Sequence, residues 1–421
     1  MILALIIFIL MYIGMLAFSR HRVWFALGAA AVMVAVGVLP IRHVPTAVNW
    51  NVLMMIAGTM GIVSLFIESG MPARLADLML RRMPNACVAI TMLAVLAGVV
   101  SAFVDNVATV LMVAPVGLAI CKKLDINPIP TIIAIAVSSN LQGAATLVGD
   151  TTSILLGGYA GMDFLDFLFW RGRFSIFWAV ELGALATVPV LLFLFRRHRS
   201  PVSADRLTEV TDYFPSVLMV AVVVLLIAAS FIPNKWDITN GLICVGLCLV
   251  GIVRACLKRR NLSALRLVAG EMDLTTLGML VGLFIVIAAV EEAGLIDAVA
   301  AWFAAIGAGS YLGLYTLLVF GSVVLSAFID NIPYVAAMLP VVSGIGSHLG
   351  IDPVGLYFGL LIGATLGGNI TPFGASANVT AIGILRRNGY EVKNRDFFRI
   401  GVPFTMTAVV IGYLFVWFVW C

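Results

Sequence analysis

Charged residues are scarce in this sequence. Asp, Glu, Lys and Arg make up only 11% of its 421 residues, and 62% of the residues are hydrophobic. Soluble proteins carry about 25% charged residues, so this composition, with a mean hydropathy of +1.12, excludes a soluble protein and predicts a polytopic membrane protein. The formal net charge of +4 identifies no partner, because charges act by their position relative to the bilayer. We expect a lipid bilayer around the chain and no nucleic-acid partner.

Residues that bind metals and cofactors are also few. The six cysteines are scattered without a metal-ligand spacing, and the four histidines fall in loops or at span ends. The chain has no Gly-rich phosphate loop and no long soluble domain. We therefore disfavour an intramembrane enzyme and expect no cofactor other than a coupling ion. The first 18 residues have no basic n-region and no cleavage site, which predicts a retained first span.

Apolar segments near 20 residues long predict spanning helices. They occur at 1–18, 23–39, 51–69, 129–160, 174–195, 214–232, 238–253, 273–291, 354–385 and 400–420. Two further segments, 86–121 and 309–346, are long enough to enter the membrane and return. If both are re-entrant hairpins, the cytosolic loops hold every Lys and Arg except Arg42, Arg171, Arg173 and Lys235. The positive-inside rule requires such a bias, so we expect two hairpins, both termini outside and a bacterial or archaeal inner membrane.

The chain repeats itself. The stretch Ser101-Ala102-Phe103-Val104-Asp105-Asn106-Val107 returns 225 residues later as Ser326-Ala327-Phe328-Ile329-Asp330-Asn331-Ile332. Each half has an odd number of spans, so the halves should lie inverted, as in many secondary transporters. The predicted fold is an all-α polytopic membrane protein with two inverted repeats of five spanning helices plus one re-entrant hairpin each, and with discontinuous helices at the midplane. We place the first repeat at 1–195, a cytosolic linker at 196–213 and the second repeat at 214–421.

The two hairpin tips should meet near the bilayer centre. A carboxylate at that depth costs about 2.5–3.5 kcal/mol, which marks a functional site. Spans 129–160 and 354–385 are interrupted by Gly, Thr, Ser and Asn, which suit unwound backbone around a cavity. The predicted substrate and ion site comprises Asp105, Asn106, Asn140, Thr146, Asp150, Ser153, Asp330, Asn331, Asn369, Thr371 and Asn378. Sodium would bind near Asp105, Asn106, Gly149, Asp330, Asn331 and Gly374. We expect no Lys or Arg at this site, so amides, dipoles and bound cations would hold an anion.

Several of these residues have a structural alternative. Asp105 and Asp330 can cap the second helix of each hairpin, and enrichment in small polar residues also serves tight helix packing. Asp150, whose repeat partner is Ala375, is either a coupling group or a local cap. Glu181 lies either in an ion pathway or at the outer interface. The stretches 71–83, 162–173, 295–305 and 390–399 are expected to lie in the interface plane as arms.

These motifs resemble the ion transporter superfamily. The resemblance rests on SAFVDN and SAFIDN, each followed by a proline, and on GAATLVGD and GGNITPFGASANV. This superfamily contains arsenite permeases, NhaD-type sodium/proton antiporters, the melanosomal P protein, and citrate and divalent-anion symporters. The arsenite permease and P protein branch is the most similar. Asn106 and Asn331 match the Asn of the symporters that helps form Na⁺ and carboxylate sites.

The chain also departs from these patterns. Asp105 and Asp330 replace the symporters' Ser, and Val107 and Ile332 replace their Thr. Asp150 is followed by Thr151-Thr152-Ser153, where the P protein pattern has Pro-Pro-Asn. The resemblance implies a homodimer with a fixed scaffold and an elevator-like transport domain.

Together these features predict an H⁺- or Na⁺-coupled secondary transporter of a small anion or oxyacid, such as arsenite or an organic acid. The alternative is a Na⁺/H⁺ antiporter with no organic substrate, in which the aspartates exchange the two cations. A passive channel is disfavoured, because inverted repeats with broken helices are typical of transporters.

Overall fold

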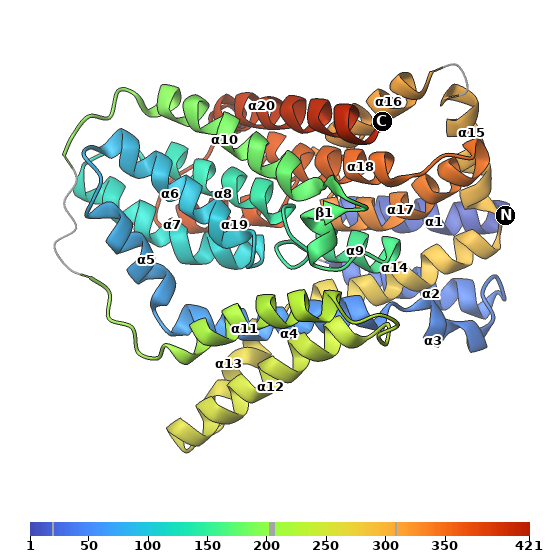
Figure 1. Ribbon diagram of the computed structural model, residues 1–421, viewed down its shortest axis with the longest axis horizontal. Helices are drawn as coiled ribbons and strands as arrows, with labels where there is room; N and C mark the ends of the chain where they lie inside the picture. The colour runs from blue at the N-terminus through green and yellow to red at the C-terminus, as the bar shows by residue number, and fades with distance from the viewer. Residues whose placement is uncertain (19–20, 202–206, 308–309) are drawn as a thin grey trace.

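The computed structural model describes residues 1–18, 21–201, 207–307 and 310–421. Helices dominate it, and most lie roughly along the long axis of the molecule (Figure 1). The first half contains α1 (Ile2–Ala17), α2 (Arg22–Ala35), η2 (Ile41–His43), α3 (Val44–Ala47), α4 (Trp50–Glu68), α5 (Met71–Leu80), α6 (Ala86–Ser101), α7 (Asn106–Lys123), α8 (Pro128–Gly143), α9 (Thr151–Ala160), η3 (Leu165–Phe167), β1 (Phe169–Trp170), β2 (Arg173–Phe174) and α10 (Ile176–Phe195).

The second half contains a similar order of elements. These are α11 (Phe214–Ser230), α12 (Thr239–Arg259), α13 (Ser263–Glu271), α14 (Leu274–Glu292), α15 (Leu295–Gly307), α16 (Tyr311–Ser326), α17 (Asn331–Leu349), α18 (Val354–Gly367), η4 (Gly368–Ile370), α19 (Ser376–Arg387) and α20 (Asn394–Trp420). Within the described residues, seven helices are long and apolar enough to cross a membrane: α4, α7, α10, α12, α14, α17 and α20. The all-helical membrane fold is thus confirmed. The inversion of the repeats and the division at 196–213 stay predictions.

Four helices from different parts of the chain pack as two matched pairs. A Cβ at Gly58 of α4 would lie 2.4 Å from the backbone of Cys244 in α12. A Cβ at Gly282 of α14 would lie 2.6 Å from the backbone of Ala26 in α2. Small residues allow such close helix approach in membranes. Each half therefore packs a helix onto one from the other half.

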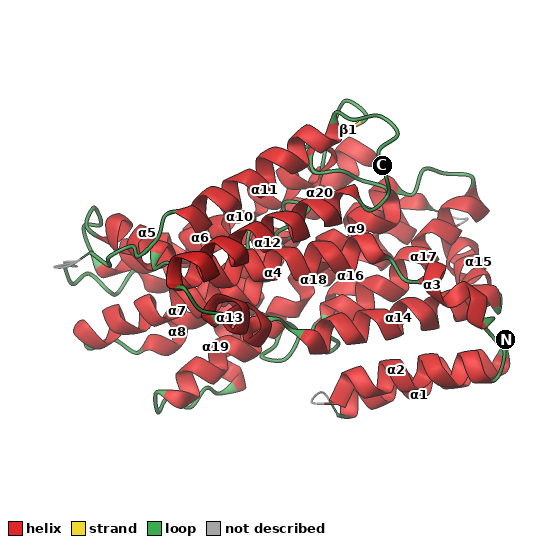
Figure 2. Cartoon of the chain, turned by 90° about the horizontal axis from the view of Figure 1, so that it is seen from below, coloured by secondary structure: helices red, strands yellow, loops and turns green. Residues whose placement is uncertain are grey.

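The first two predicted spans are shorter as helices than as apolar segments. Helices α1 and α2 have 16 and 14 residues, about 24 and 21 Å at 1.5 Å per residue, against a hydrocarbon core of about 30 Å. They form a pair along one edge of the molecule (Figure 2). This pair packs against α14, and it brings the start of α2 close to the second hairpin.

Each predicted hairpin segment forms two helices joined by a short turn, α6–α7 and α16–α17. That both helices of a pair enter and leave the membrane on the same side stays a prediction. The first helix of each has a side-chain cap, from Asn85 and Ser310. The second helix begins after Asp105 or Asp330, whose carboxylates accept bonds from the backbone amides of the first turn. An Asp at this position satisfies amides that have no partner within the helix. The capping alternative is therefore correct for both aspartates, and it leaves a ligand role open.

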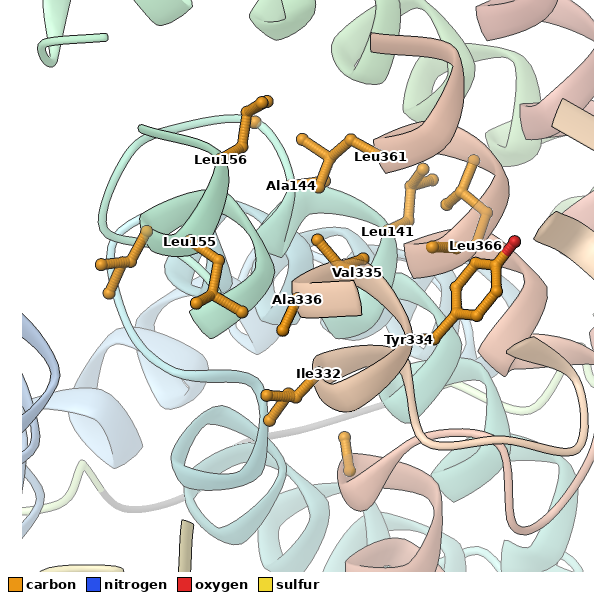
Figure 3. Close-up of a cluster of buried hydrophobic side chains, with 14 of the residues drawn as sticks. Leu141, Ala144, Leu155, Leu156, Ile332, Tyr334, Val335, Ala336, Leu361 and Leu366 are labelled. Atoms are coloured by element: carbon orange, nitrogen blue, oxygen red, sulfur yellow. The ribbon is translucent and has the colours of Figure 1, made fainter. Parts of the chain in front are cut away.

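Both predicted interrupted spans are broken. Residues 144–150 separate α8 from α9, and residues 371–375 separate η4 from α19. The tip of the second hairpin packs into the first of these breaks (Figure 3). There Val335 and Ala336 of α17 lie on the side of α9 that carries Leu155, and the two helices are in contact. This contact ties the second hairpin to the first half's broken helix.

The described part of the linker runs beside the first half. Its residue Thr208 donates both its amide and its hydroxyl to Asp77 of α5, at 2.7 and 2.6 Å. The Ser200 carbonyl accepts from the amide of Ala86 at the start of α6. Residues 202–206 of the predicted linker, and residue 309 at the start of the second hairpin, lie outside the described residues. Both termini lie toward the end of the molecule opposite this linker (Figure 1).

Two of the stretches predicted as arms are not separate helices, and the position of all four in the interface plane stays a prediction. Residues 394–399 of the stretch 390–399 belong to α20, a continuous helix of 27 residues. The run of polar residues before 400 hid this, because hydropathy detects only the apolar part of a helix that extends beyond the membrane. The stretch 162–173 instead forms η3 and a two-stranded hairpin.

Candidate functional site

The turn of the first hairpin is held by a buried polar group. Ser101 Oγ donates to Asn106 Oδ1 at 2.7 Å. Ser139 of α8 donates to the Asn106 carbonyl at 3.2 Å and lies 3.1 Å from Ser101 Oγ. All three side chains are buried. Asn106 is therefore fixed both by Ser101 of its own hairpin and by Ser139 of α8.

Each broken helix binds the hairpin of its own half in the same way. Thr146 Oγ1 donates to the carbonyl of Ala102, and Thr371 Oγ1 donates to the carbonyl of Ala327. The two contacts are equivalent in the repeat, since the residues of the second lie 225 positions after those of the first. The two predicted threonines therefore make equivalent hydrogen bonds, each joining a hairpin turn to a helix break.

Two glycines lie among backbone carbonyl oxygens beside these threonine hydrogen bonds. A Cβ at Gly149 would lie 2.5 Å from the Gly143 oxygen and 2.8 Å from those of Ser101 and Ala102. The repeat equivalent Gly374 is surrounded by the oxygens of Gly368, Ser326 and Ala327 at 2.7 to 2.9 Å. Only glycine fits such a crowded position. Clusters of carbonyl oxygens are also the type of ligand that unwound transporter helices offer to Na⁺.

The two broken helices meet through three asparagines. Asn140 Nδ2 donates to Asn369 Oδ1 at 2.8 Å and to Asn378 Oδ1 at 3.1 Å. Asn378 in turn donates to the carbonyls of Gly368 and Thr371. Asn140 Oδ1 is buried and has no hydrogen-bond partner among the described residues. Asn369 and Asn378 therefore hold the two halves together, and Asn140 alone keeps a free acceptor.

Asp150 precedes α9 but does not cap it with its side chain. Its Oδ2 accepts from Thr152 Oγ1 at 2.8 Å, and the hydroxyl of Ser153 lies 3.4 Å from the Gly143 carbonyl. Its repeat partner Ala375 takes the same place before α19. This asymmetry leaves one carboxylate in the first half with an acceptor oxygen available to a ligand.

A cavity of ≈170 Å³ opens between these elements. On the same measure a single water needs about 10–15 Å³, so the cavity has room for a partly hydrated ion or a small organic anion. Its lining includes Asp105, Asn106, Asn140, Asp150, Asn331, Ser376 and, from the start of α14 and the residues before it, Glu271 and Asp273. The structure therefore gathers five of the predicted residues, from both halves, around one cavity.

The remaining predicted residues lie elsewhere. Asp330 does not line this cavity and is paired with Arg22. The other five do not line it either and instead support the elements that do: Thr146, Ser153, Asn369, Thr371 and Asn378. Glu271 and Asp273 were not predicted. They lie at the end of an apolar segment, where acidic residues usually face solvent. Within the described ranges, no group of three or more His, Cys, Asp and Glu side chains is arranged to hold a metal ion.

The prediction that no basic side chain lies at the site is wrong for one predicted residue, Asp330, although no Lys or Arg lines the cavity itself. Arg22 Nη1 lies 2.6 Å from Asp330 Oδ2, and the two side chains are only 21% and 19% exposed. Ser376 Oγ also approaches this oxygen, at 3.4 Å. Arg22 seemed to belong to a cytosolic loop, because it closes the polar stretch between two apolar segments. The short α1–α2 pair instead brings it to the second hairpin tip.

An all-helical membrane fold, two hairpins and two broken helices around a polar cavity define a membrane transporter. The chain belongs to the citrate transporter family, whose model matches residues 3–270 and 258–420. An uncharacterized transporter of Mycobacterium tuberculosis is 31% identical over 99% of this chain and 98% of its own. The human P protein is 25% identical over 92% of this chain and 56% of its own.

Two solved structures share the fold. The YdaH transporter of Alcanivorax borkumensis superposes with a TM-score of 0.61 at 16% identity, covering 94% of this chain and 95% of that one. MtrF of Neisseria gonorrhoeae, described as one of a class of antimetabolite efflux pumps, gives a TM-score of 0.60 at 16% identity, over 92% and 84% of the two chains. The predicted resemblance to the ion transporter superfamily is confirmed.

Proposed function

We propose that this protein is an ion-coupled secondary transporter of a small organic acid or oxyacid, with citrate-like polycarboxylates as the first candidates. The observation that carries the proposal is the cavity between the two helix breaks, lined by Asp105, Asn106, Asp150 and Asn331. The family's description as citrate transporters favours an organic acid over arsenite.

The charges around the cavity define the role of the coupling ion. The lining residues include four carboxylates, those of Asp105, Asp150, Glu271 and Asp273, and no Lys or Arg. The guanidinium of Arg22 is already paired with Asp330. An anion would therefore enter only together with protons or Na⁺ that neutralise these carboxylates. The carbonyl clusters at Gly149 and Gly374 are the places where we propose Na⁺ to bind.

The same carboxylate-rich lining favours a second function. In a Na⁺/H⁺ antiporter the aspartates alone would bind the two cations in turn, and no organic substrate would be needed. The two functions differ in a measurable way, since only the first requires an added anion.

We propose an alternating-access cycle of the elevator type. The two hairpins and two broken helices are joined by the Asn140–Asn369 and threonine contacts, so they can move as one unit against α4, α12, α2 and α14. In this proposal the protein is a homodimer in a bacterial inner membrane, with both termini outside.

Purified protein in liposomes tests these functions. Separate Na⁺ and H⁺ gradients are imposed, and internal pH is followed with and without citrate. Proton flux and citrate accumulation that appear only when both citrate and the ion gradient are present would support the anion carrier. Flux driven by Na⁺ alone would identify the antiporter. Asp105→Asn serves as the inactive control for either function.

A further inference from the structure

A second group of polar side chains lies on the outer face of α8, away from the cavity between the helix breaks. Gln142 of α8 donates from Nε2 to Glu181 Oε2 of α10 at 3.1 Å. The Gln142 side chain packs against Gly98 of α6, where a Cβ would lie 2.1 Å from its Oε1. Glu181 occupies the second turn of a helix that can span the membrane. This carboxyl group has no role in the site described above.

The amide of Gln142 is only half satisfied in this arrangement. The residue is 5% exposed, and its Oε1 has no hydrogen-bond partner among the described residues. A buried acceptor without a partner is unfavourable, because it has lost its hydrogen bonds to water. The Ser138 carbonyl oxygen lies on the same side of Gly98, 3.2 Å from the position that a Cβ on Gly98 would occupy. A donor in place of Oε1 would therefore have an acceptor nearby.

Rotating the amide by half a turn would give the unpartnered end of Gln142 a donor on the side where the Ser138 carbonyl lies. Nε2 then points toward the Ser138 carbonyl, and Oε1 faces Glu181 Oε2 at the present Nε2 distance. Two oxygens at that distance need a proton between them, so Glu181 must carry it. The oxygen and nitrogen of an amide are assigned from such networks. The present orientation of Gln142 fits either protonation state of Glu181, because both offer an acceptor, and the rotated orientation fits only the protonated one.

The surroundings favour the protonated state. A pocket of ≈150 Å³ beside Glu181 is lined mainly by apolar residues of α6, α8, α10 and α20, including Val99, Leu141, Leu185 and Phe404. Its lining contains no other titratable or charged residue. Leu185 is 66% exposed on a membrane-spanning helix, so the pocket opens toward lipid. An ionised carboxylate without a countercharge is costly there.

We propose that Glu181 and Gln142 form a proton-binding site separate from the substrate cavity. Gln142 precedes Gly143, whose carbonyl belongs to the cluster at Gly149. Gln142 is therefore the chain neighbour of a residue at a proposed ion site. The proposal deepens the proposed function, because it identifies a proton as one coupling ion and Glu181 as its carrier.

Labelling with dicyclohexylcarbodiimide tests the site without any transport assay. This lipophilic reagent modifies protonated carboxyl groups in apolar surroundings, and mass spectrometry locates the adduct. We expect Glu181 to be labelled at acidic pH and labelling to fall at least severalfold as the pH is raised. Thr187→Val changes the same pocket without touching the pair and should label like the wild type. Absence of label on Glu181 at every pH, or labelling that does not respond to pH, overturns the proposal.

Transport by Glu181→Gln separates coupling from substrate binding. We expect this variant to retain citrate counterflow, which needs no net proton movement, and to lose proton-driven accumulation at least tenfold. Accumulation with an unchanged pH profile, or loss of counterflow as well, overturns a proton-carrying role. If the wild type transports no citrate at all, the proposed substrate is wrong, and the labelling experiment still decides whether Glu181 binds a proton.

Discussion

Removing the guanidinium of Arg22 should expose the carboxylate of Asp330 to added cations. The two groups are 2.6 Å apart, with side chains 21% and 19% exposed. Exposed ion pairs contribute about 0–1 kcal/mol, and breaking a buried pair costs about 3–5 kcal/mol. For this half-buried pair we expect Arg22→Ala to cost about 1–2 kcal/mol of stability in the absence of a cation.

The variant should also bind cations more tightly. The Arg22 guanidinium competes with an added cation for the Asp330 carboxylate. A competing interaction of about 1.4 kcal/mol lowers the apparent affinity of the carboxylate for the cation about tenfold. We therefore expect the Na⁺ or H⁺ concentration that gives half of the maximal thermal stabilisation to fall by roughly tenfold in Arg22→Ala. The assay is the melting temperature of the detergent-purified protein, measured against NaCl with choline chloride holding the ionic strength constant, and measured again against pH.

Two controls make the result specific. Arg259 and Glu68 form another ion pair with a closest contact of 2.6 Å and equal exposure of 35%, and neither lines the cavity. Arg259→Ala should leave the cation response unchanged. Adding Asp330→Asn to Arg22→Ala should abolish the tighter binding. Identical titrations for the wild type and Arg22→Ala would refute the idea that Arg22 competes with a cation for Asp330.

Three further predictions concern the cavity, the glycines and the topology. Asp105→Asn should abolish or uncouple transport in liposomes while the protein stays folded by gel filtration, because Asn still caps a helix; normal coupled transport would exclude Asp105 from the site. Gly149→Ala should destabilise the protein by about 1–3 kcal/mol, since overpacking forces backbone to move. A Cβ at Gly246 of α12 meets nothing within 4 Å, and Ala favours a helix over Gly, so Gly246→Ala should not destabilise the protein in the same thermal assay. A cysteine placed in 386–399 should be protected from an impermeant thiol reagent in intact cells, while the exposed native Cys421 should react; the opposite pattern would invert the predicted topology.

The local features of this protein were readable from the chain. Apolar runs predicted the spans because burial in lipid depends on composition. The Asp-Asn pairs predicted the hairpin tips, because an aspartate can bond the free amides of a following helix wherever that helix lies. Gly, Thr and Ser predicted both helix breaks. Each of these predictions depends on residues within a few positions of one another.

Contacts across the chain were decided only by helix packing. Arg22 and Asp330 are 308 residues apart, and no periodicity connects them. The asparagines Asn140 and Asn369 meet only because the two broken helices cross at their breaks, and Glu181 finds Gln142 only where α10 packs on α8. Hydropathy and capping act along the chain, so the sequence by itself determined the membrane class, the hairpins and the breaks. Which charges pair and which stay free depends on distances between helices, and the tertiary structure alone decided those.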